Sequence, residues 1–173
     1  MTTAAPDTTE ATRLADQLER AYRGGAWHGP ALAEALDGVD AATAARRPIG
    51  SAHTIWEIVA HVSVWTEVCR RRIAGEAIRD LAAEEDWPAS PPAGVDGRDG
   101  GGSVEDAWRR ELATLDERHR RLHAAVAALD DGRLDDPVAG SDPTVRGLLL
   151  GVLQHHAYHG GQIVLLAKAG AGA

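Results

Sequence analysis

The chain has 173 residues, a formal net charge of −8 and one cysteine. This length predicts a single domain over residues 1–173, and the acidic balance argues against a nucleic-acid partner, because phosphate binding needs a basic face. Cys69 alone cannot form an intramolecular disulfide, no apolar run is long enough to cross a membrane, and the polar N-terminus does not resemble a signal peptide. We therefore expect a cytoplasmic protein that does not act at membranes, with residues 1–8 disordered.

Apolar residues recur at helical spacing along most of the chain, and strand signals are almost absent. Two short helices are expected after the first long one, the first with Pro30 in its opening turn and the second capped by Asp40. The long amphipathic helices are predicted over residues 9–23, about 55–80, about 103–129 and about 143–168. Four such helices without strands favour an all-α four-helix bundle.

Capping signals support two of these helix starts. Thr54 with Glu57 forms a capping box before the second long helix, and Ser103 with Asp106 does the same before the third. The run of three arginines at 70–72 is interpreted as a solvated part of the second helix.

A long connection joins the second and third long helices. Residues 84–103 are rich in proline, glycine and charge, whereas an antiparallel hairpin of helices needs only about 2–8 residues. Extended at about 3.3 Å per residue, this segment is able to run the length of a helix. Parallel second and third helices joined by a crossover are therefore expected, with a loop that either covers a site or is disordered.

The last predicted helix holds three histidines in the stretch LQHHAYHGGQIVLL at 153–166. Each helical residue turns about 100°, so the apolar residues of this helix define an arc of about 0° to 80° measured from His155. His159 lies inside the arc at about 40°, and His156 lies beyond it at about 100°. We expect His155 and His159 to face the bundle one turn apart, a spacing that chelates metal ions, and His156 to face away. The residues that define the arc are Leu148, Val152, Ile163 and Leu166.

A third imidazole strengthens this prediction. His61 lies on the inward row of the second helix with Trp65, which is interpreted as a core residue. Alone, His61 is most simply a hydrogen-bonded core histidine. With His155 and His159, three buried imidazoles would be hard to satisfy without an ion, and three protein ligands leave an open position on a divalent metal.

The other histidines fit a ligand role less well. His119 and His123 share the same spacing, but the stripe of the third helix indicates a core position for His119 and a solvated one for His123. The sequence does not separate site from surface for His28 and His53. A di-iron bundle is excluded because no glutamate has a histidine three residues later.

Two further polar residues lie one helical turn from predicted ligands. Gln162 follows His159 and Glu57 precedes His61, so each is a candidate to hydrogen-bond a ligand imidazole or a water molecule. For Glu57, the capping box is the preferred explanation.

The stretches SAHTIWEIVAHVSVW, at the second helix, and GVLQHHAYHGGQI, at the last, resemble the DinB-like superfamily of metal-binding four-helix proteins. AWHGPALAEAL also resembles the segment that follows the first helix in that family. The resemblance implies a long crossover between helices two and three and a divalent metal, commonly zinc or nickel. It implies the ligands His61, His155 and His159, and frequent homodimers.

The resemblance also implies a class of chemistry. Some DinB-like proteins are S-transferases that use bacillithiol, mycothiol or glutathione, and one is a mycothiol-dependent maleylpyruvate isomerase. We therefore expect a metal-dependent transferase that activates a small-molecule thiol toward an electrophilic substrate. A non-catalytic metal-binding module for stress or dimerisation, or a metal-dependent hydrolase, remains an alternative.

Overall fold

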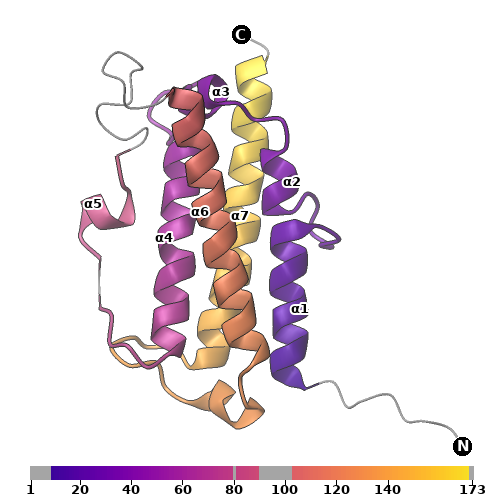
Figure 1. The fold of residues 1–173 in the computed structure, drawn as a ribbon, viewed down its shortest axis with the longest axis vertical. Helices are drawn as coiled ribbons and strands as arrows, with labels where there is room; N and C mark the ends of the chain where they lie inside the picture. The colour runs from indigo at the N-terminus through magenta and orange to yellow at the C-terminus, as the bar shows by residue number, and fades with distance from the viewer. Residues whose placement is uncertain (1–8, 80, 90–102, 172–173) are drawn as a thin grey trace, which may run out of the picture.

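The computed structural model of the chain describes residues 9–79, 81–89 and 103–171. Four long helices form an all-α bundle, as predicted (Figure 1). The expected disorder of residues 1–8 and most of the expected crossover loop, residues 90–102, lie outside the described residues. The long helices are α1 (Glu10–Arg23), α4 (Ile55–Ile73), α6 (Val104–Ala127) and α7 (Val145–Ala171).

Helices α4 and α6 run parallel, and α1 and α7 run in the opposite direction (Figure 1). The connection from α4 to α6 therefore returns along the bundle, which confirms the predicted crossover. A short helix, α5 (Ala83–Asp86), lies on this connection beside α4. The other short elements are α2 (Leu32–Leu36), α3 (Ala41–Ala45) and the 3₁₀ helix η1 (Asp131–Asp135).

Polar side chains fix several helix starts as the sequence predicts. The Thr54 hydroxyl accepts the Glu57 N–H, and the Glu57 carboxylate accepts the Thr54 N–H, which completes the capping box of α4. Ser103 and Asp106 form the equivalent box at α6, and Asp40 caps α3. Pro30 does not lie in the first turn of α2, because the N-cap of that helix is Ala31.

Helix α4 ends at Ile73 rather than near residue 80. Gly75 adopts a left-handed conformation with φ of 94°, which a residue with a Cβ rarely takes. Its N–H bonds the carbonyl of Arg72, and the Glu76 N–H bonds the carbonyl of Arg71. This Schellman arrangement satisfies the last carbonyls and stops the helix.

Arg72 corrects the prediction that the arginine run is solvated. Its side chain is buried, and its guanidinium donates hydrogen bonds to the backbone carbonyls of Ile78 and Arg79. The guanidinium also lies over the Trp65 ring, 5.7 Å from the ring centre. Arg72 therefore ties the chain that leaves α4 back to the helix.

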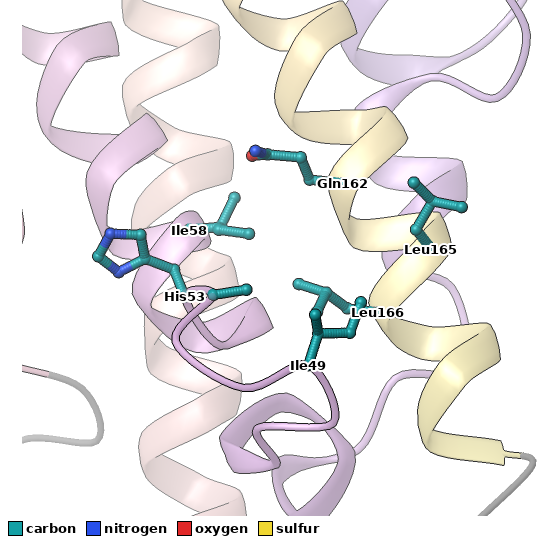
Figure 2. Close-up of a pocket in the computed structure, with 7 residues that line it drawn as sticks. Ile49, His53, Ile58, Gln162, Leu165 and Leu166 are labelled. Atoms are coloured by element: carbon teal, nitrogen blue, oxygen red, sulfur yellow. The ribbon is translucent and has the colours of Figure 1, made fainter.

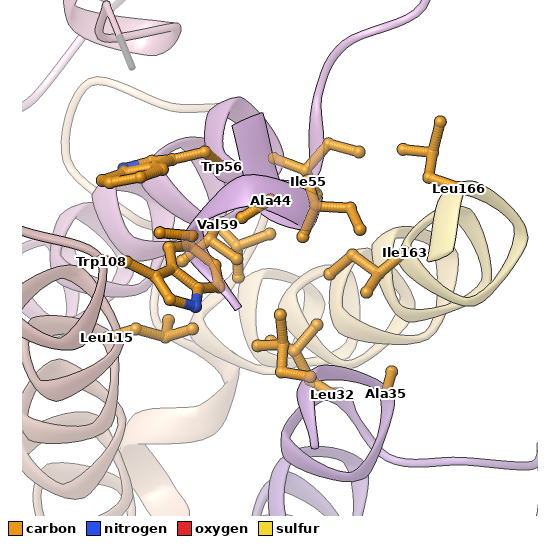
Figure 3. Close-up of a cluster of buried hydrophobic side chains, with 14 of the residues drawn as sticks. Leu32, Ala35, Ala44, Ile55, Trp56, Val59, Trp108, Leu115, Ile163 and Leu166 are labelled. Carbon is orange, nitrogen blue, oxygen red and sulfur yellow. The ribbon is translucent and has the colours of Figure 1, made fainter. Parts of the chain in front are cut away.

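Two apolar clusters fill the bundle. The first joins the end of α1 with α2, α3, α4, α6 and α7 around Trp56 and Trp108 (Figure 3). The Trp108 indole donates to the Val39 carbonyl at 2.7 Å. The second joins α1, α4, α6, η1 and α7. On α7 the residues of the second cluster end at Leu153 and those of the first begin at Ile163. The histidines of α7 lie between the two clusters.

Among the described residues, no helix combines the length and the apolar character that a membrane crossing requires.

Candidate metal centre

Three imidazoles from two helices converge between the apolar clusters. His61 comes from α4, and His155 and His159 lie one turn apart on α7. The Nε2 atom of His155 is 3.0 Å from Nε2 of His61 and 3.0 Å from Nε2 of His159. His61 and His159 are buried and His155 is half-buried. The three predicted ligands are thus brought together, with ligand atoms all within 4.8 Å of one another.

Hydrogen bonds on the far side of two rings determine which nitrogen carries the proton. His61 Nδ1 lies 2.9 Å from the carbonyl oxygen of Asp86, and His159 Nδ1 lies 2.7 Å from Oε1 of Gln162. Both oxygens are acceptors, so both Nδ1 atoms donate and both Nε2 atoms present lone pairs. His155 Nε2 has at most one proton to share between these two lone pairs. Three facing nitrogens with one proton or none are better satisfied by a cation.

Burial keeps two of the rings neutral. It lowers the pKa of His155 to about 3, with the nearby imidazoles His159 and His61 acting in the same direction. Burial also lowers the pKa of His159 to about 4, against the opposing effect of the hydrogen bond that His159 donates to Gln162. Neutral imidazole is the form that binds a metal, so these two rings need not lose a proton near neutral pH before they coordinate an ion.

The spacing of the nitrogens also fits a metal ion. Two imidazole nitrogens at tetrahedral positions, each about 2.0–2.1 Å from zinc, are about 3.3 Å apart. The 3.0 Å separations at His155 are close to that value. His61, His155 and His159 are therefore the residues that would hold the ion.

The two candidate supporting residues occupy different positions. Gln162 contacts His159 directly, at the distance given above. Glu57 instead caps α4, and its carboxylate also contacts Arg47 at 2.7 Å and His53 at 3.2 Å. The position of Glu57 is therefore explained by its capping of α4, the role that was preferred from the sequence.

Three aromatic or acidic residues near His61 were not predicted to belong to the site. Asp86 and Trp87 come from the crossover segment, and Trp87 stacks on the His61 ring. Trp65 is half-buried and donates to Asp86 Oδ1 at 2.6 Å, so it is not the core residue that was expected. The sequence did offer one signal for this contact, because Trp87 is a large aromatic residue in a segment otherwise rich in proline, glycine and acidic residues.

His156 points into the bundle, contrary to the helical-wheel prediction. Its side chain is 1% exposed, and its Nε2 lies 3.4 Å from the Thr66 hydroxyl. The predicted arc was too narrow because it omitted Leu149, which is fully buried and lies at about 120° on the same wheel. His156 is nevertheless not one of the three converging ligands.

His156 belongs to a second histidine cluster, formed with Tyr22 and His119. Tyr22 and His119 stack with ring centres 3.9 Å apart, and His119 Nε2 contacts the Glu19 carboxylate at 2.9 Å. The rings of His119 and His156 are 6.2 Å apart. Within the described part of the chain, the Nδ1 atoms of both histidines are buried without a hydrogen-bond partner.

His28, His53 and His123 belong to neither of these two groups. His119 is buried, as predicted, but His123 is half-buried rather than solvated. His28 is exposed. His53 is exposed as a whole residue, yet its ring stacks on Trp87 with centres 3.6 Å apart.

Two pockets flank the three ligands. The metal-side pocket, of about 460 Å³, reaches His61 and His155, and its remaining lining residues are Trp65, Asp86, Pro143, Gly147, Leu148, Gly151 and Val152. The Gln162 pocket, of about 280 Å³, is lined by Gln162, the residue that contacts His159, and by His53 (Figure 2). Figure 2 shows Gln162 from α7 and His53, from the segment before α4, on opposite sides of this second pocket. Of these two pockets, the metal-side pocket is the one lined by His61 and His155 themselves.

Comparison with known proteins places this arrangement in a family. No curated protein and no solved structure matches the chain. The model of the DinB superfamily matches residues 25–163, which include α2 to α6, most of α7 and all three converging histidines. The protein belongs to the DinB superfamily.

Proposed function

We propose that the protein binds a divalent metal ion through His61, His155 and His159 and uses it to transfer a low-molecular-weight thiol to an electrophile. The observation that carries the metal assignment is the pair of fixed rings, His61 and His159, whose unprotonated Nε2 atoms both face His155. A buried arrangement of this kind is costly unless a cation satisfies it.

The metal-side pocket supports a catalytic rather than a purely structural role. Three protein ligands leave a position open to solvent or substrate, and this pocket reaches two of the ligands. When bound, a divalent ion lowers the pKa of a thiol that coordinates it, which supplies thiolate at neutral pH. Trp65, Leu148 and Val152 give this pocket apolar walls beside the open position.

Metal analysis tests the first half of the proposal. Protein purified without a nickel column is expected to hold about one equivalent of zinc or nickel, and His61→Ala is expected to hold almost none. If the wild-type protein, supplied with either metal, binds neither, the metal assignment is wrong.

Thiol transfer tests the second half. The loaded protein is assayed with a panel of mycothiol, bacillithiol and glutathione against an aromatic electrophile, with the apoprotein as the blank. Attack by sulfur forms a carbon–sulfur bond, and the leaving group departs with its electron pair. A metal-loaded protein that accelerates none of these reactions would favour the non-catalytic module.

Gly151 allows the pocket to be tested separately from the metal. A Cβ added at Gly151 meets no atom within 4 Å, and this glycine lines the metal-side pocket. Gly151→Leu is therefore expected to keep the metal, fill the pocket and lower kcat/KM on the order of a hundredfold. Gly161→Leu is the matched control, because Gly161 lies on the same helix, is also open and lines neither pocket.

A further inference from the structure

Within its described residues, the crossover segment contacts a ligand of the candidate metal centre on α4. Asp86 ends the short helix α5, and Trp87 follows it. We call these two residues the clasp. They lie 25 and 26 positions after His61 in the sequence, yet both touch its ring.

Asp86 holds the His61 ring through two oxygen atoms. Its carbonyl oxygen is 2.9 Å and its carboxylate Oδ1 is 3.0 Å from His61 Nδ1. The same Oδ1 accepts a hydrogen bond from the Trp65 indole at 2.6 Å. Trp65 is one turn after His61 on α4, so the helix that carries the ligand also anchors the residue that orients it.

Trp87 fixes the plane of the same ring. Its indole lies between two imidazoles, with ring centres 3.9 Å from His61 and 3.6 Å from His53. The interplanar angles are 8° and 7°, so the three rings form one parallel stack. Rotation of the His61 ring about its side-chain bonds would break this stack.

The other two ligands need no such help from a loop. His155 and His159 lie on one continuous helix, and Gln162, which contacts His159, lies on that helix too. His61 comes from a different helix, and its Nδ1 partner comes from the crossover. The orientation of His61 therefore depends on where the crossover segment lies.

We propose that Asp86 and Trp87 are positioning residues for His61, so that metal binding and the docking of these two residues against α4 are coupled. This inference rests on the proposed metal site. Asp86 keeps the proton on Nδ1 and Trp87 holds the ring plane, which together aim the Nε2 lone pair at His155. Coupling is reciprocal, so a bound metal stabilises the closed clasp to the same extent that the clasp strengthens metal binding.

Zinc affinity of clasp variants tests the proposal. Trp87→Ala and Asp86→Ala are expected to bind zinc about 10- to 100-fold more weakly than the wild-type protein, as is usual when a residue that orients a metal ligand is lost. Trp87→Phe retains an aromatic ring for the stack and is expected to restore most of the affinity.

Matched controls separate positioning from general stability. Trp27 is fully exposed and Glu84 is an exposed residue of α5, so Trp27→Ala and Glu84→Ala are expected to keep wild-type zinc affinity. Thermal melts of the apoproteins show whether each variant is folded. Wild-type affinity in a folded Trp87→Ala protein would overturn the inference, whereas absence of zinc binding by the wild-type protein would overturn the metal site itself.

Amide hydrogen exchange measures the reverse direction of the coupling. Zinc is expected to slow exchange in residues 81–88 of the wild-type protein, and to do so far less in Trp87→Ala at saturating zinc. The proposed coupling would be contradicted if zinc slowed exchange in these residues equally in both proteins, or if it did not slow exchange in the zinc-loaded wild-type protein.

Discussion

The bundle contains two groups of histidines. Neighbouring residues of α7 belong to different groups, and their side chains point to different parts of the bundle. His155 and His159 direct Nε2 atoms at each other and at His61 from α4. His156, one position after His155, faces Tyr22 and His119 instead. His61 and His155 of the first group line the metal-side pocket, whereas His119 and His156 of the second group are almost completely buried.

This difference shows that burial of imidazoles is not enough to indicate a metal centre. In the second cluster, His119 has a carboxylate partner in Glu19 and a stacking partner in Tyr22. In the candidate centre, two rings are held by acceptors on their far side, so their lone pairs face a third ring. The convergence of unprotonated nitrogens distinguishes the two groups.

The largest expected effect separates neighbours in the sequence. His155→Ala and His159→Ala each remove one of three ligands and are expected to abolish most metal binding, while His156→Ala retains about one equivalent. Metal-to-protein stoichiometry of the three variants, prepared identically, measures this. Loss of metal from His156→Ala together with its retention in His155→Ala would reverse the assignment of the two groups.

Removal of the metal is expected to lower the free energy of unfolding only while the three histidines of the first group are intact. An ion bound to the native state alone stabilises it by about 2.7 kcal/mol at a hundredfold excess over its Kd. Chelation should therefore lower the Tm of the wild-type protein and leave that of His61→Ala unchanged. A wild-type melting curve unaffected by verified metal removal would argue against a bridging ion.

The second cluster is expected to contribute to stability without binding metal. His156→Ala and His119→Ala each leave a cavity in the core, and each should lower the free energy of unfolding by roughly 1–3 kcal/mol. The apoproteins are compared by urea denaturation, and the loaded proteins by metal content. His123→Ala, at a half-buried position, serves as the control and should change neither quantity.

The smallest expected effect concerns Glu57. Because it caps α4, Glu57→Ala should cost about 0.5–1 kcal/mol of stability and leave metal content unchanged. The measurement pairs a thermal melt with metal analysis. A large loss of metal with little change in stability would show that Glu57 acts on the centre, through His53 and Trp87, rather than on the helix.

Local signals in the sequence predicted the fold well. The capping boxes at Thr54 and Ser103 predicted two helix starts to within one residue of their observed positions. Each box depends only on two residues that are three positions apart in the sequence. The end of α4 was misplaced because the apolar pattern continues past Ile73, while the stop depends on the backbone conformation of Gly75.

The inward position of His155 and His159 was predictable because helical spacing puts them on one face of α7, and His61 was predictable from the inward row of α4. The inward position of His156 was not, since a wheel drawn from apolar residues treats polar residues as solvated. Here the interior opposite His156 contains Thr66, Tyr22 and His119. Asp86 and Trp87 were missed because no periodicity constrains where a crossover segment meets the bundle.

The connection between α4 and α7 also sets when the centre is able to form in a cell. His61 and His155 are 94 residues apart in the chain, and the two helices meet through their side chains. At about 5–20 residues per second, a ribosome needs roughly 5–20 s to add the intervening segment. A nascent chain that has exposed α4 therefore carries a single imidazole ligand throughout that interval. Under the proposed metal assignment, an ion is bound by all three histidines only after the last helix has been synthesised.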